Sequence, residues 1–171
     1  IDHPDFAPDR IATLKKGNAG LGAEYKRLTL VEMGITGAVP AYGLTETYGN
    51  ATVGAHDDPL EVKLETDGTA LSGQEILIVD PVTREPLPVG ETGLVLVRGH
   101  VTPGYLDNPQ ETAKALLPDG FFDTGDLGFL EGLLLGDLQR VELAFAGKAK
   151  LVEGPALGDL LGLGLLAGGN F

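Results

Sequence analysis

The chain has 171 residues, the size of about one domain, and 43% of them are hydrophobic, enough to build a core. Its 12 Lys and Arg residues stand against 25 Asp and Glu residues, so the net charge is −13. Such a surface repels phosphate backbones and excludes nucleic acid and anionic membranes as expected partners, but not a small anion held by local backbone N–H groups. The chain has no cysteine, which removes disulfides, thiolate metal sites and cysteine nucleophiles together.

The sequence also lacks the usual signs of membrane insertion or export. Its most apolar run, Ala156 to Ala167, is too short to span a membrane and contains Asp159. No charged-then-apolar signal segment opens the chain, which starts at Ile1 rather than at a methionine. We therefore expect a cytoplasmic protein whose N-terminus was processed or whose sequence starts within a gene.

Residues 1–60 predict one helix and one buried strand. The opening residues, up to Gly22, are rich in Pro, Asp, Gly and Asn and read as a loop. Apolar and aromatic side chains then recur at helical spacing up to Met33, and Gly34 gives the stop signal. Residues 35–42 predict a strand that leads into a loop at 43–50.

From residue 61 the hydrophobic period changes to two. Residues 61–64 alternate, and residues 76–79 and 94–97 are continuous runs of Leu and β-branched side chains. Residues 80–90, between those two runs, are dense in turn formers. This pattern predicts a hairpin-rich, barrel-like antiparallel subdomain.

A helix is expected to begin at Asn108. Asn108 can cap the helix, Pro109 suits its first position, and Glu111 can reach back to the cap. The helix should run to about Leu117 and stop at Pro118.

The end of the chain, residues 131–171, is rich in Leu and Gly, so we expect weak order there. The predicted fold class is α/β: the end of a strand–helix layer followed by a small twisted antiparallel β-barrel-like subdomain. The corresponding division is residues 1–60, 61–130 and 131–171.

A first candidate site follows the predicted strand 35–42. A glycine turn at Gly43 exposes backbone N–H groups, and Thr45 and Thr47 can donate to phosphate oxygens. Glu46 can hold Mg²⁺, and Tyr42 offers a face on which a base can stack. The competing interpretation is an ordinary strand–turn–helix corner with Thr as its cap, and for this short motif alone it is favoured.

A second candidate site is the segment 119–126, "DGFFDTGD". A carboxylate at the exposed rim of a nucleotide site, here Asp126, can accept both ribose hydroxyl protons. The competing interpretation is an Asp-rich turn in which Asp123 and Asp126 bond local backbone N–H groups, and alone it again prevails.

Taken in order, four segments resemble one family. They are "AYGLTETYGNAT" (41–52), "GQEILIVDPVTREPLPVGETGLVLVRG" (73–99), "VTPGYLDNPQETAKAL" (101–116) and "DGFFDTGDLGFL" (119–130). Together they resemble the adenylate-forming superfamily, which includes acyl-CoA synthetases, luciferases and adenylation domains. The resemblance covers residues 1–130.

The resemblance implies a role for each matching residue. The backbone at 20–23 would line the adenine or acyl pocket. Tyr42 would stack on adenine, and Gly43 would shape the turn. Thr45 would bind phosphate, Glu46 would bind Mg²⁺ and Asp126 would bind ribose. The implied reaction is attack of a substrate carboxylate on ATP, giving an acyl-adenylate and pyrophosphate, then a thioester with CoA. Thr45 and Glu46 would be its catalytic residues, and ATP or AMP, Mg²⁺ and CoA its cofactors.

The chain also departs from the family pattern. The Ser/Thr/Gly-rich phosphate loop lies upstream of this sequence, and the C-terminal domain with its catalytic lysine is absent. Asp123 and Lys148 stand where relatives often have Arg. We therefore expect part of an ATP-dependent carboxylate-activating ligase, inactive without the missing N-terminal and C-terminal parts of the same enzyme. The alternatives are a non-catalytic remnant serving as a structural or interaction module, and a generic acidic β-rich binding domain.

Overall fold

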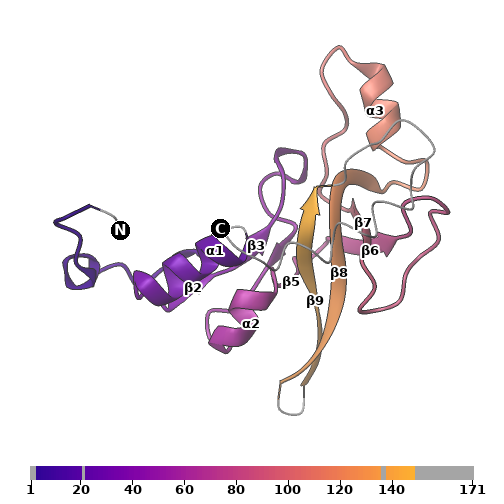
Figure 1. Ribbon diagram of the computed structural model, residues 1–171. Helices are drawn as coiled ribbons and strands as arrows, with labels where there is room; N and C mark the ends of the chain where they lie inside the picture. Colours follow the sequence, from indigo (N-terminus) through magenta and orange to yellow (C-terminus); the bar gives the residue numbers. More distant parts are fainter. Residues whose placement is uncertain (1–2, 21, 136–137, 149–171) are drawn as a thin grey trace.

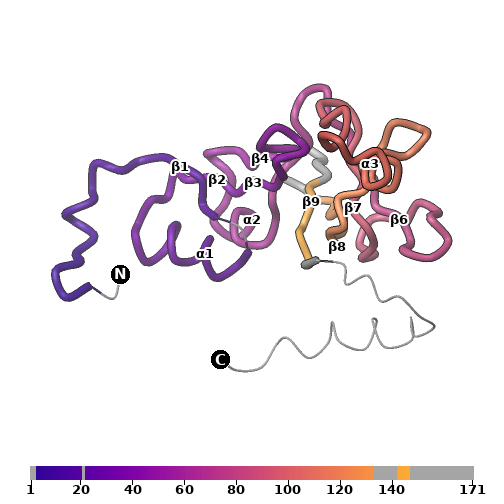
Figure 2. The backbone as a smooth tube through the Cα atoms, turned by 90° about the horizontal axis from the view of Figure 1, so that it is seen from above, coloured from indigo at the N-terminus to yellow at the C-terminus, as the bar shows by residue number. Residues whose placement is uncertain are grey.

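The computed structural model describes residues 3–20, 22–135 and 138–148, so expectations for 149–171 lie outside the described residues. Short helices and strands of the N-terminal half lie beside a larger antiparallel sheet formed by the C-terminal half (Figure 1). Seen from above, β1 and α1 lie at one end of the molecule and β6 at the other (Figure 2). None of the helices in the described part of the chain is long and apolar enough to cross a membrane.

The N-terminal layer contains one helix packed on a small parallel sheet. Its elements are the 3-10 helix η1 (Pro8–Ile11), β1 (Lys16–Asn18), α1 (Ala23–Arg27), the π-helical turn η2 (Leu28–Glu32) and β2 (Gly37–Val39). Strands β1 and β2 pair in parallel, with Lys16 opposite Gly37. The helix predicted over residues 22–33 is confirmed as α1 and η2, and Gly34 ends it with a φ of +69°.

The strand predicted over residues 35–42 is present as two short strands in different sheets, β2 and β3 (Ala41–Tyr42). Pro40 lies between them and has no N–H with which to continue a ladder. Strand β3 pairs with β4 (Thr52–Val53), which pairs with β5 (Thr69–Ala70), both antiparallel. The 3-10 helix η3 (Thr45–Thr47) occupies the loop between β3 and β4.

The alternation at residues 61–64 indicated strand structure, and this prediction is wrong, because these residues form the helix α2 (Leu60–Glu65). Four residues are too few to separate a period of two from a helical period, and Leu, Glu and Lys are good helix formers. Tertiary contacts also favour the helix. The buried Lys63 Nζ donates to the carbonyls of Thr36 (2.9 Å) and His56 (2.6 Å), and Leu64 packs on the core of the N-terminal layer.

The C-terminal half forms a four-stranded antiparallel sheet in the order β6-β7-β8-β9. Its strands are β6 (Glu75–Val79), β7 (Gly93–Arg98), β8 (Phe122–Leu135) and β9 (Leu138–Lys148). The strands predicted at 76–79 and 94–97 are confirmed, with Ile78 opposite Val95. Strand β8 curls as it crosses the sheet (Figure 1), so the predicted α/β class with a barrel-like antiparallel part is confirmed.

Weak order was expected from residue 131, and this stays a prediction, although residues 131–135 and 138–148 are paired as strands. These residues continue β8 and form β9, and their ladder runs from Asp126 opposite Lys148 to Leu135 opposite Leu138. The sequence carries a signal for β9 in Val141, Leu143 and Phe145, which alternate with other side chains. The division of the chain at residues 60 and 130 stays a prediction.

The helix predicted from Asn108 is confirmed as α3 (Pro109–Ala115). The Asn108 side chain accepts from the N–H of Glu111 at 3.2 Å, as a cap should. The Glu111 carboxylate does not reach back to the cap, because it pairs with Lys114 at 2.6 Å while the Asn108 N–H donates to Tyr105.

The main hydrophobic core joins the two halves of the molecule. Its buried members are Tyr42, Ala51, Ile78, Val95, Val97 and Leu143. Each large apolar side chain buried in this way stabilises the fold by about 1.5–3 kcal/mol. The core therefore fixes β3, which carries the first candidate motif, against the sheet, which carries the second.

Candidate functional site

The two candidate motifs meet at a buried hydrogen bond. The hydroxyl of Tyr42, on β3, donates to Asp126 Oδ2, on β8, at 2.7 Å, and both residues are 2% exposed. Burial raises the pKa of Tyr42 well above its ordinary value, and the nearby Asp126 carboxylate raises it further. The hydroxyl thus stays a donor at any physiological pH.

Asp126 was expected at an exposed rim, and this expectation is wrong. A register shift between β7 and β8 falls at Thr124, Gly125 and Asp126. The Thr124 hydroxyl donates to the Val95 carbonyl at 2.8 Å, and Gly125 takes a φ of +67°. Irregularities of this kind re-aim side chains, and here Asp126 is turned inward against Tyr42.

The competing interpretation of segment 119–126 is correct for Asp123. Its Oδ1 accepts from the Gly125 N–H at 3.0 Å, and its Oδ2 pairs with Arg84 at 2.7 Å. Asp126 instead accepts from a residue 84 positions away in the sequence. The two carboxylates therefore differ: one supports its own turn, and the other joins two sheets.

The ring of Tyr42 packs inside the protein. It stacks on Phe145 of β9, with ring centroids 5.8 Å apart and an angle of 27° between the planes. Its predicted stacking on adenine stays a prediction. Sequence reasoning missed Phe145, although the alternation of β9 could have found it.

The turn after Tyr42 is shaped by contacts within the chain. A Cβ on Gly43 would lie 2.0 Å from the carbonyl oxygen of Gly49, so only glycine fits. The Thr47 hydroxyl accepts from the Leu44 N–H at 2.9 Å and lies 3.0 Å from its carbonyl, which closes η3. Thr47 thus has a structural role, but as the third residue of η3 bonded back to Leu44 rather than as the cap that the competing interpretation expected, and Thr45 is exposed.

Glu46 has a partner that sequence reasoning missed. Its Oε1 accepts from the hydroxyl of Tyr105 at 2.9 Å. Partial burial raises the pKa of Tyr105, and the hydrogen bond to Glu46 and its charge add to the rise. The described residues contain no cluster of three or more groups suited to a metal ion. A lone half-buried carboxylate still fits Mg²⁺, which takes few protein ligands beside phosphates and water.

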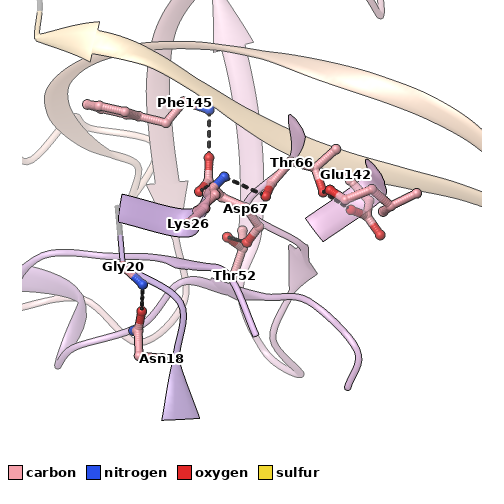
Figure 3. Close-up of polar contacts among 9 residues, drawn as sticks. Asn18, Gly20, Lys26, Thr52, Thr66, Asp67, Glu142 and Phe145 are labelled. Carbon is pink, nitrogen blue, oxygen red and sulfur yellow. Dashed lines mark hydrogen bonds and ion pairs between the residues drawn. The ribbon is translucent and has the colours of Figure 1, made fainter. Parts of the chain in front are cut away.

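A cavity of about 410 Å³ opens between α1, α2 and the β8–β9 hairpin. Its lining residues are Gly22, Ala23, Lys26, Leu64, Glu65, Asp67, Phe129, Glu131 and Phe145. Gly22 and Ala23 belong to the backbone segment for which the resemblance implies a place in a pocket. Asp67 and Lys26, both buried, form an ion pair of 2.7 Å beside this cavity, and sequence reasoning found neither (Figure 3).

Comparisons with known proteins identify the class. The AMP-binding enzyme family matches residues 4–106, so the chain belongs to that family. It is 38% identical over 127 residues to a salicylyl-CoA synthase / salicylate adenylyltransferase of a Streptomyces species, and 33% identical over 124 residues to 4-coumarate–CoA ligase 1 of Arabidopsis thaliana. These matches cover 73% and 71% of this chain.

A solved structure agrees with this class. The ATP-bound MatB of Rhodopseudomonas palustris superposes with a TM-score of 0.64 at 26% identity, covering 85% of this chain. The chain spans 22% of the length of each of the two curated relatives and 34% of the MatB chain. It is therefore a fragment-length relative of the AMP-forming acyl-CoA ligases.

Proposed function

We propose that this chain supplies the ribose-binding and Mg²⁺–phosphate-binding part of an ATP-dependent ligase that activates a carboxylate as its acyl-adenylate and passes it to CoA. The observation that carries this proposal is the hydrogen bond between Tyr42 and Asp126. It brings two motifs that are distant in the sequence to one place, where β3 leads into the Thr45–Glu46 turn. Membership of the AMP-binding family supports the class of reaction.

In this proposal each residue has a defined task. Asp126 accepts the ribose hydroxyls, which replace the Tyr42 hydroxyl as its donors. Thr45 donates to a phosphate oxygen from its exposed position on η3. Glu46 would hold Mg²⁺, which supplies charge neutralisation on the phosphates when bound. Tyr42 and Gly43 shape the adenine side of the site.

The chain is proposed to be catalytically incompetent by itself. It spans 22% of the length of the two curated relatives described above, and formation of an acyl-adenylate from ATP needs charge stabilisation from more groups than Thr45 and Glu46 offer. Its partners would then be the remaining N-terminal and C-terminal parts of the same enzyme. We expect no pyrophosphate release from the purified chain with ATP and a carboxylate, and release that disappears in a Glu46→Gln variant would contradict this.

Nucleotide binding tests the site without requiring catalysis. Saturation-transfer NMR with millimolar ATP detects affinities down to about 1 mM, near −4 kcal/mol. The folded chain should give an ATP signal that Asp126→Asn abolishes. Asp123→Asn is the matched control, because Asp123 is a neighbouring carboxylate engaged only with Arg84 and its own turn, and it should retain the signal.

Two results would overturn the proposal. Equal ATP signals from both variants would show that Asp126 does not bind the nucleotide. A folded chain with no ATP signal would instead favour the alternative function, a non-catalytic module that keeps the shape of the family.

A further inference from the structure

Asp67 lies between α2 and β5 and is 2% exposed. Its carboxylate has two partners from opposite ends of the described chain (Figure 3). Oδ1 lies 2.7 Å from the Nζ of Lys26 on α1, and Oδ2 accepts from the backbone N–H of Phe145 on β9 at 2.9 Å. One buried side chain thus connects the N-terminal helix to the last strand.

Backbone contacts of the same residue hold β9 in place. The Asp67 N–H donates to the Leu143 carbonyl at 2.7 Å, and the Leu143 N–H donates to Gly68 at 3.0 Å. The Asp67 carbonyl accepts from the Thr52 hydroxyl at 2.7 Å. The two backbone bonds fix β9 at Leu143, whereas the Asp67 carboxylate fixes it two residues further on, at Phe145.

Phe145 connects this contact to the candidate site. Its ring stacks on Tyr42, and the Tyr42 hydroxyl donates to Asp126. A continuous series of contacts therefore runs from Lys26 through Asp67, Phe145 and Tyr42 to Asp126. The side chains of Lys26, Asp67 and Phe145 also line the 410 Å³ cavity.

Stability alone does not explain this ion pair. Desolvating two charges costs about as much as their attraction returns, and well-packed apolar residues often serve a core equally well or better. An acceptor aimed at one backbone N–H does something that an apolar residue cannot do, because it specifies where that strand segment lies.

We propose that Asp67 is a positioning residue of the nucleotide site: it anchors Phe145 through its N–H, and Phe145 sets the position of Tyr42 beside Asp126. This inference rests on the proposed function, since the site that it positions is the proposed nucleotide site. The Lys26 ammonium holds the Asp67 carboxylate from the other side.

Two double variants isolate the acceptor. Lys26→Met combined with Asp67→Leu removes the ion pair and the acceptor for Phe145. Lys26→Met combined with Asp67→Asn removes the same ion pair but keeps an oxygen that can accept from Phe145. Neither leaves an unpaired buried charge, and both lose the bond from Lys26 to the Thr66 carbonyl, so they differ in the acceptor for Phe145 and in the asparagine NH2 group.

The readouts are ATP affinity by NMR titration, the thermal midpoint, and the ring chemical shifts of Tyr42 and Phe145. We expect ATP affinity about tenfold weaker in the Leu variant, the size typical of changes along a coupled network, and restored in the Asn variant. The ring shifts that arise from Tyr42–Phe145 stacking should be lost in the first and kept in the second.

Thr52→Val is a further control, because it removes a buried hydrogen bond to the Asp67 carbonyl and leaves the carboxylate untouched. It should lower the thermal midpoint without changing ATP affinity. Equal affinities and equal ring shifts in the two double variants would overturn the inference. If the unaltered chain binds no ATP, the proposed function fails, yet the ring shifts still decide whether Asp67 positions Phe145 and Tyr42.

Discussion

The parallel pair β1–β2 and the antiparallel sheet β6–β9 differ in how fully their strands are buried and paired. All three residues of β1 are exposed, and within the described residues β1 has a hydrogen-bonded neighbour on one side only. In β7, by contrast, residues 93–97 are buried and both edges are paired. Parallel sheets are normally covered on both faces, so β1–β2 is the less self-sufficient of the two.

The stability of the chain is concentrated in the antiparallel sheet. The antiparallel strands pair with neighbours in the sequence and contribute most of the buried residues of the main core, whereas the parallel pair depends on α1, η2 and one small cluster. We therefore expect substitutions in the sheet, or in contacts that tie the helix to it, to cost more than substitutions in the outer N-terminal layer.

The largest effect is expected where the two regions are tied together. Asp67→Ala leaves the buried Lys26 ammonium without its carboxylate and should cost about 3–5 kcal/mol of unfolding free energy. Glu111→Ala breaks an exposed ion pair on α3 and should cost about 1 kcal/mol or less. Urea denaturation of both variants measures the difference. Similar losses would mean that Asp67 does not join the two halves.

The next effect comes from burial and compares the same substitution, valine to alanine, in the two regions. Val95 is 0% exposed in β7, and Val31 is 44% exposed in η2. Val95→Ala should lower the unfolding free energy by about 1.5–3 kcal/mol, and Val31→Ala by about 0.5 kcal/mol or less. Thermal unfolding followed by circular dichroism gives both values. A larger loss at Val31 would show that the N-terminal layer, rather than the sheet, limits stability.

Tyr42, which connects β3 to the antiparallel sheet, should make the folded chain less stable at alkaline pH. Its folded pKa is raised by burial, so its contribution is complete below the ordinary tyrosine pKa of about 10 and is lost as the pH rises above that value. The unfolded chain then releases a proton that the folded chain keeps. Between pH 9 and about 11, stability should fall by up to about 1.4 kcal/mol per pH unit from this group.

The control for this pH effect is Tyr42→Phe, which keeps the ring and removes the titrating hydroxyl. Denaturant melts of both proteins across this pH range give the difference curve, in which other titrating groups cancel. The difference in unfolding free energy between the two proteins should be constant below about pH 9. Above that pH it should shrink, because only the unaltered chain loses stability through Tyr42. A difference that does not change with pH would show that the Tyr42 hydroxyl ionises equally in both states.

Sequence reasoning succeeded where local signals agree with the tertiary environment. The Leu and β-branched runs of β6 and β7, the cap at Asn108 and the stop at Gly34 all specify their elements within a few residues. Sequence reasoning failed at α2, where four residues could not define a period, and at β9, where abundant Gly and Leu concealed an alternation.

The candidate site shows the same limit. Tyr42, Glu46 and Asp126 could be named as candidates because they belong to contiguous motifs. Their partners Tyr105 and Phe145 were not found, because those contacts depend on how distant segments fold together. The burial of Asp126 follows from an irregularity between β7 and β8, which no local pattern announces.

The smallest expected effect is that of Gly17→Ala in the outer layer, and a glycine of the sheet, Gly93, supplies its contrast. A Cβ on Gly17, in β1, would meet nothing within 4 Å, whereas a Cβ on Gly93, in β7, would lie 2.3 Å from the Val79 carbonyl oxygen. Gly17→Ala should therefore be neutral or should stabilise the chain by about 0.4–1 kcal/mol, because alanine reduces the entropy of the unfolded chain. Gly93→Ala should instead cost at least about 1–3 kcal/mol, because the backbone of β6 cannot move aside without breaking its ladder with β7. Denaturant melts of the two variants test the comparison at its most sensitive point. A clear loss of stability in Gly17→Ala would mean that β1, although exposed along its whole length, is packed against a part of the protein that restricts it as tightly as β6 restricts β7.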